Sequence, residues 1–87
     1  MNYEIKLKRA ARRQLDALSE RDYQKVAGVI SGLAQNPRPQ NVKKLSDSGL
    51  WRIRIGRFRV VYAIDDTARL VNIARVARRR EDTYRKL

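Results

Sequence analysis

Trp51-Arg52-Ile53-Arg54-Ile55-Gly56-Arg57-Phe58-Arg59-Val60-Val61-Tyr62 is the segment of this sequence with the clearest structural pattern. Apolar and charged side chains alternate on both sides of Gly56-Arg57, which is typical of two strands joined by a tight turn. The alternation places Trp51 and Phe58 with the aliphatic residues on one face, as parts of the core. The opposite face carries Arg52, Arg54 and Arg59. We therefore expect helices over the first face and an anionic partner for the second.

The charge balance of the whole chain indicates the same kind of partner. Its 87 residues contain 21 Lys and Arg against 9 Asp and Glu, a formal net charge of +12. A hydrophobic share of 43% predicts a folded domain, and the length suits a single domain spanning residues 1–87. A field of this size favours binding of a polyanion: nucleic acid first, an acidic protein second and an anionic membrane surface third.

Two residue types are missing, and this narrows the possible chemistry. The sequence contains no cysteine and no histidine, which excludes disulfides, thiolate metal sites, cysteine nucleophiles and imidazole catalysis. The adjacent carboxylates Asp65-Asp66 and Glu81-Asp82 lack the spacing of metal ligands, and we interpret them as turn and capping residues. We predict no cofactor and no metal. No window approaches the roughly 20 apolar residues of a membrane span, and the N-terminus lacks the apolar core of a signal peptide, so we expect a cytoplasmic protein without membrane contact.

The segments before the hairpin predict one strand and two helices. Residues 3–7 alternate as a short strand does, and residues 8–18 show the apolar spacing of an amphipathic helix. Ser19 with Asp22 three residues later predicts the N-cap of a second helix starting at Glu20, which Asn36-Pro37-Arg38-Pro39 ends. Inside it, Gly28 and Gly32 are expected to allow close backbone packing.

The segments around and after the hairpin complete the predicted fold. Residues 40–49 are interpreted as irregular, and the nearly continuous apolar run of residues 70–77 as a central strand covered on both faces. Residues 77–87 could form a short C-terminal helix. The order β-α-α-β-β-β predicts a two-layer α+β domain, with an antiparallel four-stranded sheet and an αα-hairpin on one face.

Two clusters of cations and one tyrosine are candidate functional residues. Arg52, Arg54, Arg57 and Arg59 fall within eight residues, and guanidinium groups suit bidentate contact with phosphate. Arg78-Arg79-Arg80 follows a strand expected beside the hairpin and could converge on the same pocket; a solvated tail is the alternative. Tyr84 lies among cations that would lower its pKa and allow work as a general base, although a packing role is the other interpretation.

These residues carry a resemblance that covers nearly the whole chain. The sequence resembles RelE-type toxins of the RelE/ParE superfamily, the ribosome-dependent mRNA endoribonucleases of bacterial toxin–antitoxin pairs. The matching segments are Asn36-Pro37-Arg38-Pro39, Val42-Lys43-Lys44-Leu45, residues 50–62, and residues 75–80 with Tyr84-Arg85. The motif in residues 50–62 is specific to the superfamily and less specific to activity, because gyrase-poisoning ParE relatives share the scaffold.

The resemblance implies a RelE-like fold, a reaction and a set of site residues. The concave face of the sheet would receive mRNA in the ribosomal A site, where the 2′-hydroxyl attacks the adjacent phosphate. Arg59 matches the arginine that binds the scissile phosphate, Arg79 the one that stabilises the leaving group, and Tyr84 the terminal tyrosine. Arg52 and Arg54 match two cationic positions on the first hairpin strand. The remaining expected phosphate-binding residues are Lys43, Lys44, Arg57, Arg78 and Arg80.

The chain departs from the family pattern at the positions concerned with proton transfer. Well-studied relatives have lysines on the first hairpin strand, and many have a histidine where this chain has Arg78. An arginine stays protonated in proteins and is a poor base. The identity of the general base is therefore open, with Tyr84, Lys43, Lys44 and Glu81 as the nearby groups able to move a proton.

The resemblance also implies partners and leaves alternatives. We expect an acidic RelB-like antitoxin that covers the cationic face, contact with the ribosome and mRNA, and contact with operator DNA only through the antitoxin complex. The first alternative is a ParE-like toxin that binds and poisons gyrase without catalysis. The second is a non-catalytic RNA-binding relative, in which alanine at Tyr84 would leave the phenotype unchanged.

Overall fold

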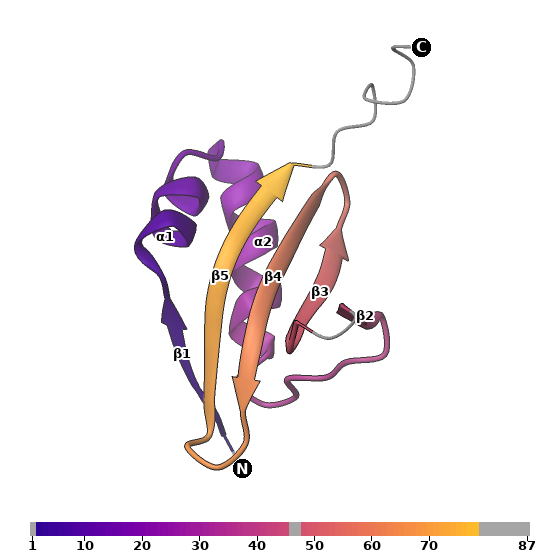
Figure 1. Ribbon diagram of the computed structural model, residues 1–87. Coiled ribbons are helices and arrows are strands. Elements are labelled where there is room, and N and C mark those ends of the chain that lie inside the picture. The colour runs from indigo at the N-terminus through magenta and orange to yellow at the C-terminus, as the bar shows by residue number, and fades with distance from the viewer. Residues whose placement is uncertain (1, 46–47, 79–87) are drawn as a thin grey trace.

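The computed structural model describes residues 2–45 and 48–78. In chain order the elements are β1 (Glu4–Leu7), α1 (Arg9–Asp16), α2 (Glu20–Gly32), β2 (Val42–Leu45), β3 (Leu50–Ile55), β4 (Phe58–Asp65) and β5 (Leu70–Arg78). The strands form one sheet in the order β1-β5-β4-β3-β2, with α2 behind β4 and β5 and α1 beside β5 (Figure 1). The predicted α+β class is confirmed. The predicted C-terminal helix lies outside the described residues.

The sheet differs from the prediction in strand number and in one direction. It has five strands, because Val42–Leu45, predicted as irregular, pairs antiparallel with β3 as an edge strand. Four residues that include two lysines give too short an alternation to identify from sequence, and lysines are common on edge strands. The sheet is also mixed, because β1 pairs parallel to β5. Alternation along residues 3–7 predicts a strand but does not specify its direction.

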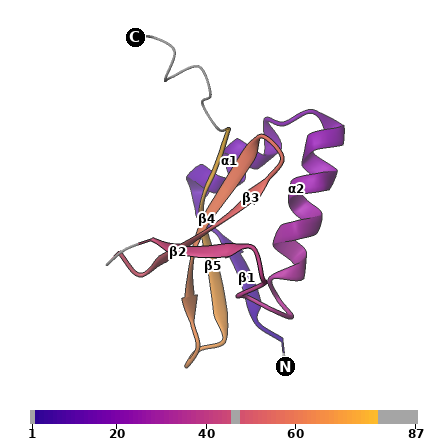
Figure 2. The ribbon, with the colours of Figure 1, turned by 90° about the vertical axis from the view of Figure 1, so that its right-hand side faces the viewer.

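The helices form the second layer on one face of the sheet (Figure 2). The cap at Ser19 is confirmed, since its Oγ accepts a hydrogen bond from the Asp22 amide at 3.3 Å. The first helix is shorter than the predicted residues 8–18. The expected close packing at Gly28 and Gly32 is wrong, because a Cβ atom at either position would meet nothing within 4 Å. No helix among the described residues is both long and apolar enough to cross a membrane.

The core lies between the helices and the sheet. It contains Ala11, Leu15, Val26, Ile30, Leu33, Ile53, Ile55, Phe58, Val60, Tyr62, Val71, Ile73 and Val76. Phe58 is 3% exposed, and Trp51 is half-buried against this cluster, so the assignment of both aromatics to the core is confirmed. The Tyr62 hydroxyl donates to the Pro37 carbonyl at 2.7 Å, which ties the α2–β2 connection to β4. The hairpin therefore places its apolar face inward, as its alternation predicts.

Strand β5 is covered by helices on one face only, so the prediction that both faces are covered is wrong. Its alternation is interrupted, because Val61 pairs with Arg75 whereas Tyr62 pairs with Ile73, which leaves Ala74 as an extra residue. Such a β-bulge reverses the face on which later side chains lie. Ile73 and Val76 consequently both enter the core, and the run looks continuously apolar in sequence.

Candidate anion-binding site

A cleft of about 300 Å³ opens on the sheet face that the helices leave uncovered. Its lining consists of three arginines and three aliphatic residues: Arg52, Arg59 and Arg75 with Leu45, Leu50 and Val61. Within the described part of the chain this lining includes no carboxylate, hydroxyl or imidazole group. We call these six residues the arginine cleft. Its composition is that of an anion site with an apolar floor.

Strand register explains why these side chains meet. Lys43 of β2 lies beside Arg52 of β3, Arg52 beside Val61 of β4, and Val61 beside Arg75 of β5. Residues in direct register point to the same face, so this row crosses four strands on the uncovered face. One step along the hairpin, Arg54 lies beside Arg59, and Arg59 beside Ala77. The cations thus surround Val61, and small Ala77 leaves space beside Arg59.

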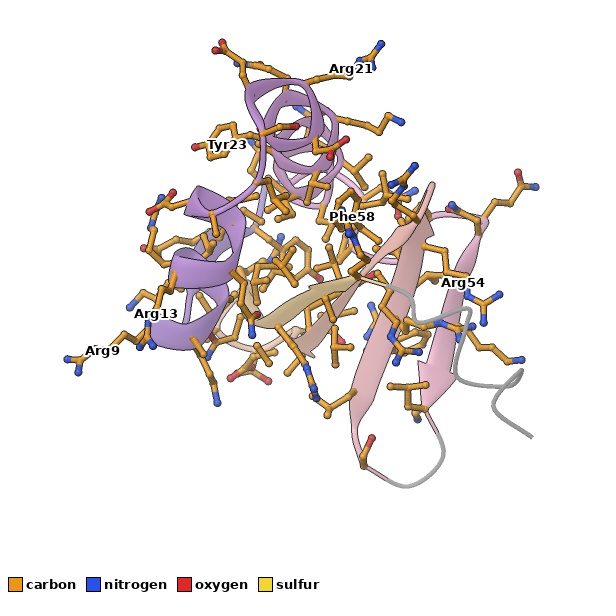
Figure 3. All side chains as sticks on the ribbon, turned by 90° about the horizontal axis from the view of Figure 1, so that it is seen from above. Arg9, Arg13, Arg21, Tyr23, Arg54 and Phe58 are labelled. Carbon is orange, nitrogen blue, oxygen red and sulfur yellow. The ribbon has the colours of Figure 1, made fainter. Side chains whose placement is uncertain are left out.

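Three of the charges in this region are available to a partner. Arg54, Arg59 and Arg75 are exposed, and within the described part of the chain none of them makes a hydrogen bond or an ion pair. Arg52 is half-buried. Arg54 extends away from the helix layer, on the opposite side of the molecule from Arg9 and Arg13 (Figure 3). An anion bound here would meet several cations without first displacing a carboxylate from Arg54, Arg59 or Arg75.

The structure separates several residues that sequence reasoning had grouped. Lys43 lies on the cleft face, but Lys44 lies on the other face of β2, with its Nζ 5.7 Å from the Trp51 ring centroid. Arg57 lines a different cleft, beside Arg21 and Lys25 of α2. The Arg78 guanidinium lies 5.7 Å from the Phe58 ring centroid, at the end of β5. Arg79, Arg80 and Tyr84 lie outside the described residues.

Arg75 lines the cleft although sequence reasoning did not single it out as a site residue. Strict alternation from Val71 and Ile73 would place Arg75 on the core face, and the bulge at Ala74 turns it outward. The signal available in the sequence was the spacing of β-branched residues, which is two from Val71 to Ile73 and three from Ile73 to Val76. A three-residue step within a strand indicates a bulge.

Comparison with known proteins identifies the family of this chain. The model of the ParE toxin family of type II toxin–antitoxin systems (parDE) matches residues 5–83. The chain is also similar to a chain of the RelBE2 toxin–antitoxin complex from Mycobacterium tuberculosis, with 32% identity over 91% of this chain and 100% of that chain, and a TM-score of 0.80. This chain is a RelE-type toxin of the RelE/ParE superfamily.

Two further solved structures define how far the likeness extends. The archaeal RelE–RelB complex from Pyrococcus horikoshii matches the toxin at 25% identity over 93% of this chain and 99% of that chain, with a TM-score of 0.83. A chain of the ParDE system from Pseudomonas aeruginosa matches at 15% identity over 90% of this chain and 97% of that chain, with a TM-score of 0.75. The second likeness concerns the fold alone. The RelE-like architecture predicted from sequence is confirmed.

Two tyrosines among the described residues, Tyr62 and Tyr3, do not line the arginine cleft. Tyr62 is fully buried on the helix side of β4, and burial raises its pKa to about 12. The Tyr3 hydroxyl donates to Asp66 Oδ1 at 2.6 Å, and this hydrogen bond is the main reason that the pKa of Tyr3 is raised. Among the described residues the cleft can therefore bind and stabilise negative charge, but its lining contains no acid–base group suited to neutral pH.

A separate cluster of polar side chains, Arg38, Asp66 and Tyr3, lies at the end of the sheet where β4 turns into β5. Arg38 makes a bidentate pair with Asp66, through Nη1 at 3.2 Å and Nη2 at 2.9 Å, and its guanidinium lies 5.1 Å from the Trp51 ring centroid. The hydrogen bonds from Arg38, and then from Tyr3, lower the pKa of Asp66. Because these groups form hydrogen bonds with one another, we interpret the cluster as a structural contact that holds the α2–β2 connection against the β4–β5 turn.

Proposed function

We propose that this toxin is a ribosome-dependent endoribonuclease that cleaves mRNA in the A site and so inhibits translation. The arginine cleft is the observation that carries the proposal. Three guanidinium groups over an apolar floor suit a phosphodiester, because a less polar surrounding strengthens each charge interaction. The large net charge of +12 supports a polyanionic substrate, and the superfamily resemblance supports mRNA as that substrate.

The reaction would require positioning and charge stabilisation above all. The ribose 2′-hydroxyl attacks the adjacent phosphorus, the bond from phosphorus to the 5′-oxygen breaks, and the products carry a 2′,3′-cyclic phosphate and a 5′-hydroxyl. Arg52 and Arg59 are proposed to bind the phosphate and to stabilise the negative charge that grows on its oxygens. Arg54 lies beside Arg59 and adds to the positive potential.

Proton transfer is assigned by resemblance, because the described lining supplies no group for it. Tyr84 is proposed to orient or exchange the proton of the attacking hydroxyl, and Arg79 to stabilise the leaving oxygen. Lys43 is proposed to bind an RNA phosphate beside Arg52, with Lys44, Arg57, Arg78 and Arg80 as further contacts to RNA. The proposal requires no metal and no cofactor.

An acidic, RelB-like antitoxin is the proposed partner of the toxin in the cytoplasm. The similar chains from Mycobacterium tuberculosis and Pyrococcus horikoshii come from toxin–antitoxin complexes, and a +12 surface favours an acidic segment that covers the cationic face. Operator DNA is expected to be bound only by the complex.

The test is primer extension on a defined mRNA in stalled ribosomes. We expect discrete A-site cuts by the wild type that require ribosomes, and a fall of roughly 100-fold or more for Arg59→Ala and for Tyr84→Ala. Arg13→Ala is the matched control, because Arg13 is an exposed arginine of α1 on the opposite side of the molecule. No cuts by a wild type that still arrests growth would overturn the nuclease proposal.

A gyrase-poisoning activity is the second candidate, favoured by the match to the ParE family model. On this proposal the arginines bind a partner protein without chemistry, so Arg59→Ala and Tyr84→Ala would leave toxicity intact. DNA damage, measured by a gyrase cleavage assay, would replace translation arrest. Ribosome-dependent cuts without accumulation of cleaved DNA would reject it. Equal RNA binding by wild type and Tyr84→Ala, without cuts, would instead indicate a non-catalytic RNA-binding protein.

A further inference from the structure

The β-bulge on β5 determines which residues the arginine cleft contains. Ala74 is the extra residue, so Arg75 pairs with Val61 on the uncovered face while Val76 pairs with Val60 in the core. Without the extra residue, Arg75 would continue the alternation of Val71 and Ile73 and point at the helices. The bulge therefore adds a third guanidinium group to a cleft that the hairpin alone would supply with two.

A residue outside the sheet holds the strand immediately after the bulge. Strand β1 ends at Leu7, opposite Ile73, so beyond this point none of the described strands lies along this edge of β5. Helix α1 occupies the space, and Gln14 Oε1 accepts a hydrogen bond from the Val76 amide at 2.8 Å. This contact satisfies an amide that would otherwise lack a partner, and it fixes the backbone that presents Arg75.

The position of Arg75 suits a contact with the substrate on the side opposite Arg52. Val61 separates the two in the row across the sheet, so their backbones are two strand spacings apart, roughly 9–10 Å. Arg59 precedes Val61 by two residues on β4 and points to the same face. An anion lying over Val61 would thus have a cation on each of three strands.

We propose that Arg75 is a substrate-contacting residue of the toxin, which binds the RNA phosphate over Val61 together with Arg52 and Arg59. This assignment rests on the proposed nuclease function and adds a residue to its site. Arg75 is exposed and, within the described part of the chain, forms no hydrogen bond or ion pair, so no structural contact accounts for it. Its neighbours Ala74 and Ala77 indicate that a small side chain is tolerated on this part of β5.

The experiment measures single-turnover cleavage on programmed ribosomes at increasing toxin concentration, for the wild type and four variants. For Arg75→Ala we expect a fall of about 10- to 100-fold, the size of one charge-assisted hydrogen bond. Arg75→Lys should recover part of it. Arg75→Ala combined with Ala10→Arg keeps the net charge by adding an arginine on α1, and should remain as slow as Arg75→Ala. Arg9→Ala, an exposed arginine of α1, should cleave within about twofold of wild type.

A second readout separates binding from folding. With an RNA that carries a 2′-O-methyl group at the scissile nucleotide, Arg75→Ala should weaken binding to the free toxin and reduce the salt dependence by about one phosphate contact. Urea midpoints should match the wild type, since the side chain is exposed. Full cleavage by Arg75→Ala, or full recovery by the Ala10→Arg combination, overturns the assignment alone. Absence of wild-type cleavage overturns the proposed function and the assignment with it.

Discussion

Replacing Tyr62 with phenylalanine tests one buried hydrogen bond and also how the stability of the fold depends on pH. The side chain is fully buried, and its hydroxyl donates to the buried Pro37 carbonyl at 2.7 Å. Tyr62→Phe keeps the ring and leaves that carbonyl without its donor, which costs about 1–3 kcal/mol at neutral pH. The contact matters for the site, because Tyr62 lies on the reverse of the strand that carries Val61.

The pKa of the same group predicts how this difference changes with pH. Burial raises the pKa of Tyr62 from its ordinary 10 to about 12, so the fold favours the neutral phenol. A group whose folded-state pKa is raised contributes stability that is complete below the unfolded-state pKa and is lost as pH rises toward the folded-state pKa. At 1.36 kcal/mol for each pKa unit, the loss is about 1.4 kcal/mol at pH 11.

Urea unfolding of both proteins at pH 7 and pH 11 measures the prediction. All other ionisable groups are the same in both proteins, so their effects cancel in the difference between the two free energies of unfolding. We expect Tyr62→Phe to be less stable at pH 7, with the difference shrinking by about 1.4 kcal/mol at pH 11. A difference of the same size at both pH values would refute the assignment of a raised pKa to Tyr62.

Three further substitutions test other contacts of the fold. Gln14→Ala should lower stability by about 1–2 kcal/mol by leaving the Val76 amide without an acceptor, and should lower Tm by about 4–8 °C per kcal/mol; an unchanged thermal midpoint would contradict it. Gly28→Ala should raise stability by about 0.5–1 kcal/mol in urea unfolding, because the new Cβ meets nothing within 4 Å; destabilisation would show unrecognised packing. Arg38→Ala should raise the pKa of Asp66 by removing the hydrogen bonds that lower it, as an NMR titration would show; an identical titration curve would argue against the pair.

The parts of the fold that could be predicted from sequence are those specified by local chemistry. The Ser19 cap and the alternation around Gly56 each depend on a few neighbouring residues, and Gly56 has the positive φ of 60° that suits a glycine in a tight turn. Strand β2 and the direction of β1 depend on pairing with distant segments. Alternation identifies neither, because strand pairing is a tertiary property.

The candidate site shows the same division. Arg52 and Arg59 could be placed on one face because the hairpin alternates without interruption. Lys43 and Lys44 were grouped as neighbours, yet adjacent residues of a strand point to opposite faces, and only recognition of β2 would have separated them. Arg75 required recognition of a bulge. The roles of Arg79, Arg80 and Tyr84 stay predictions.

The direct pairing of Arg54 with Arg59 is the feature of the sheet that local stability does not explain. Like charges directly opposite each other on neighbouring strands oppose folding by about 0.2–1 kcal/mol. Within the described residues neither side chain has a carboxylate to offset this repulsion. A bound polyanion would remove the repulsion. Because it binds the folded state, it would also stabilise the fold, by an amount that rises with its concentration relative to its Kd. If the pair exists for binding, Arg54→Ala should make the free toxin slightly more stable and its complex with RNA weaker. The opposite sign for stability would mean that Arg54 supports the fold.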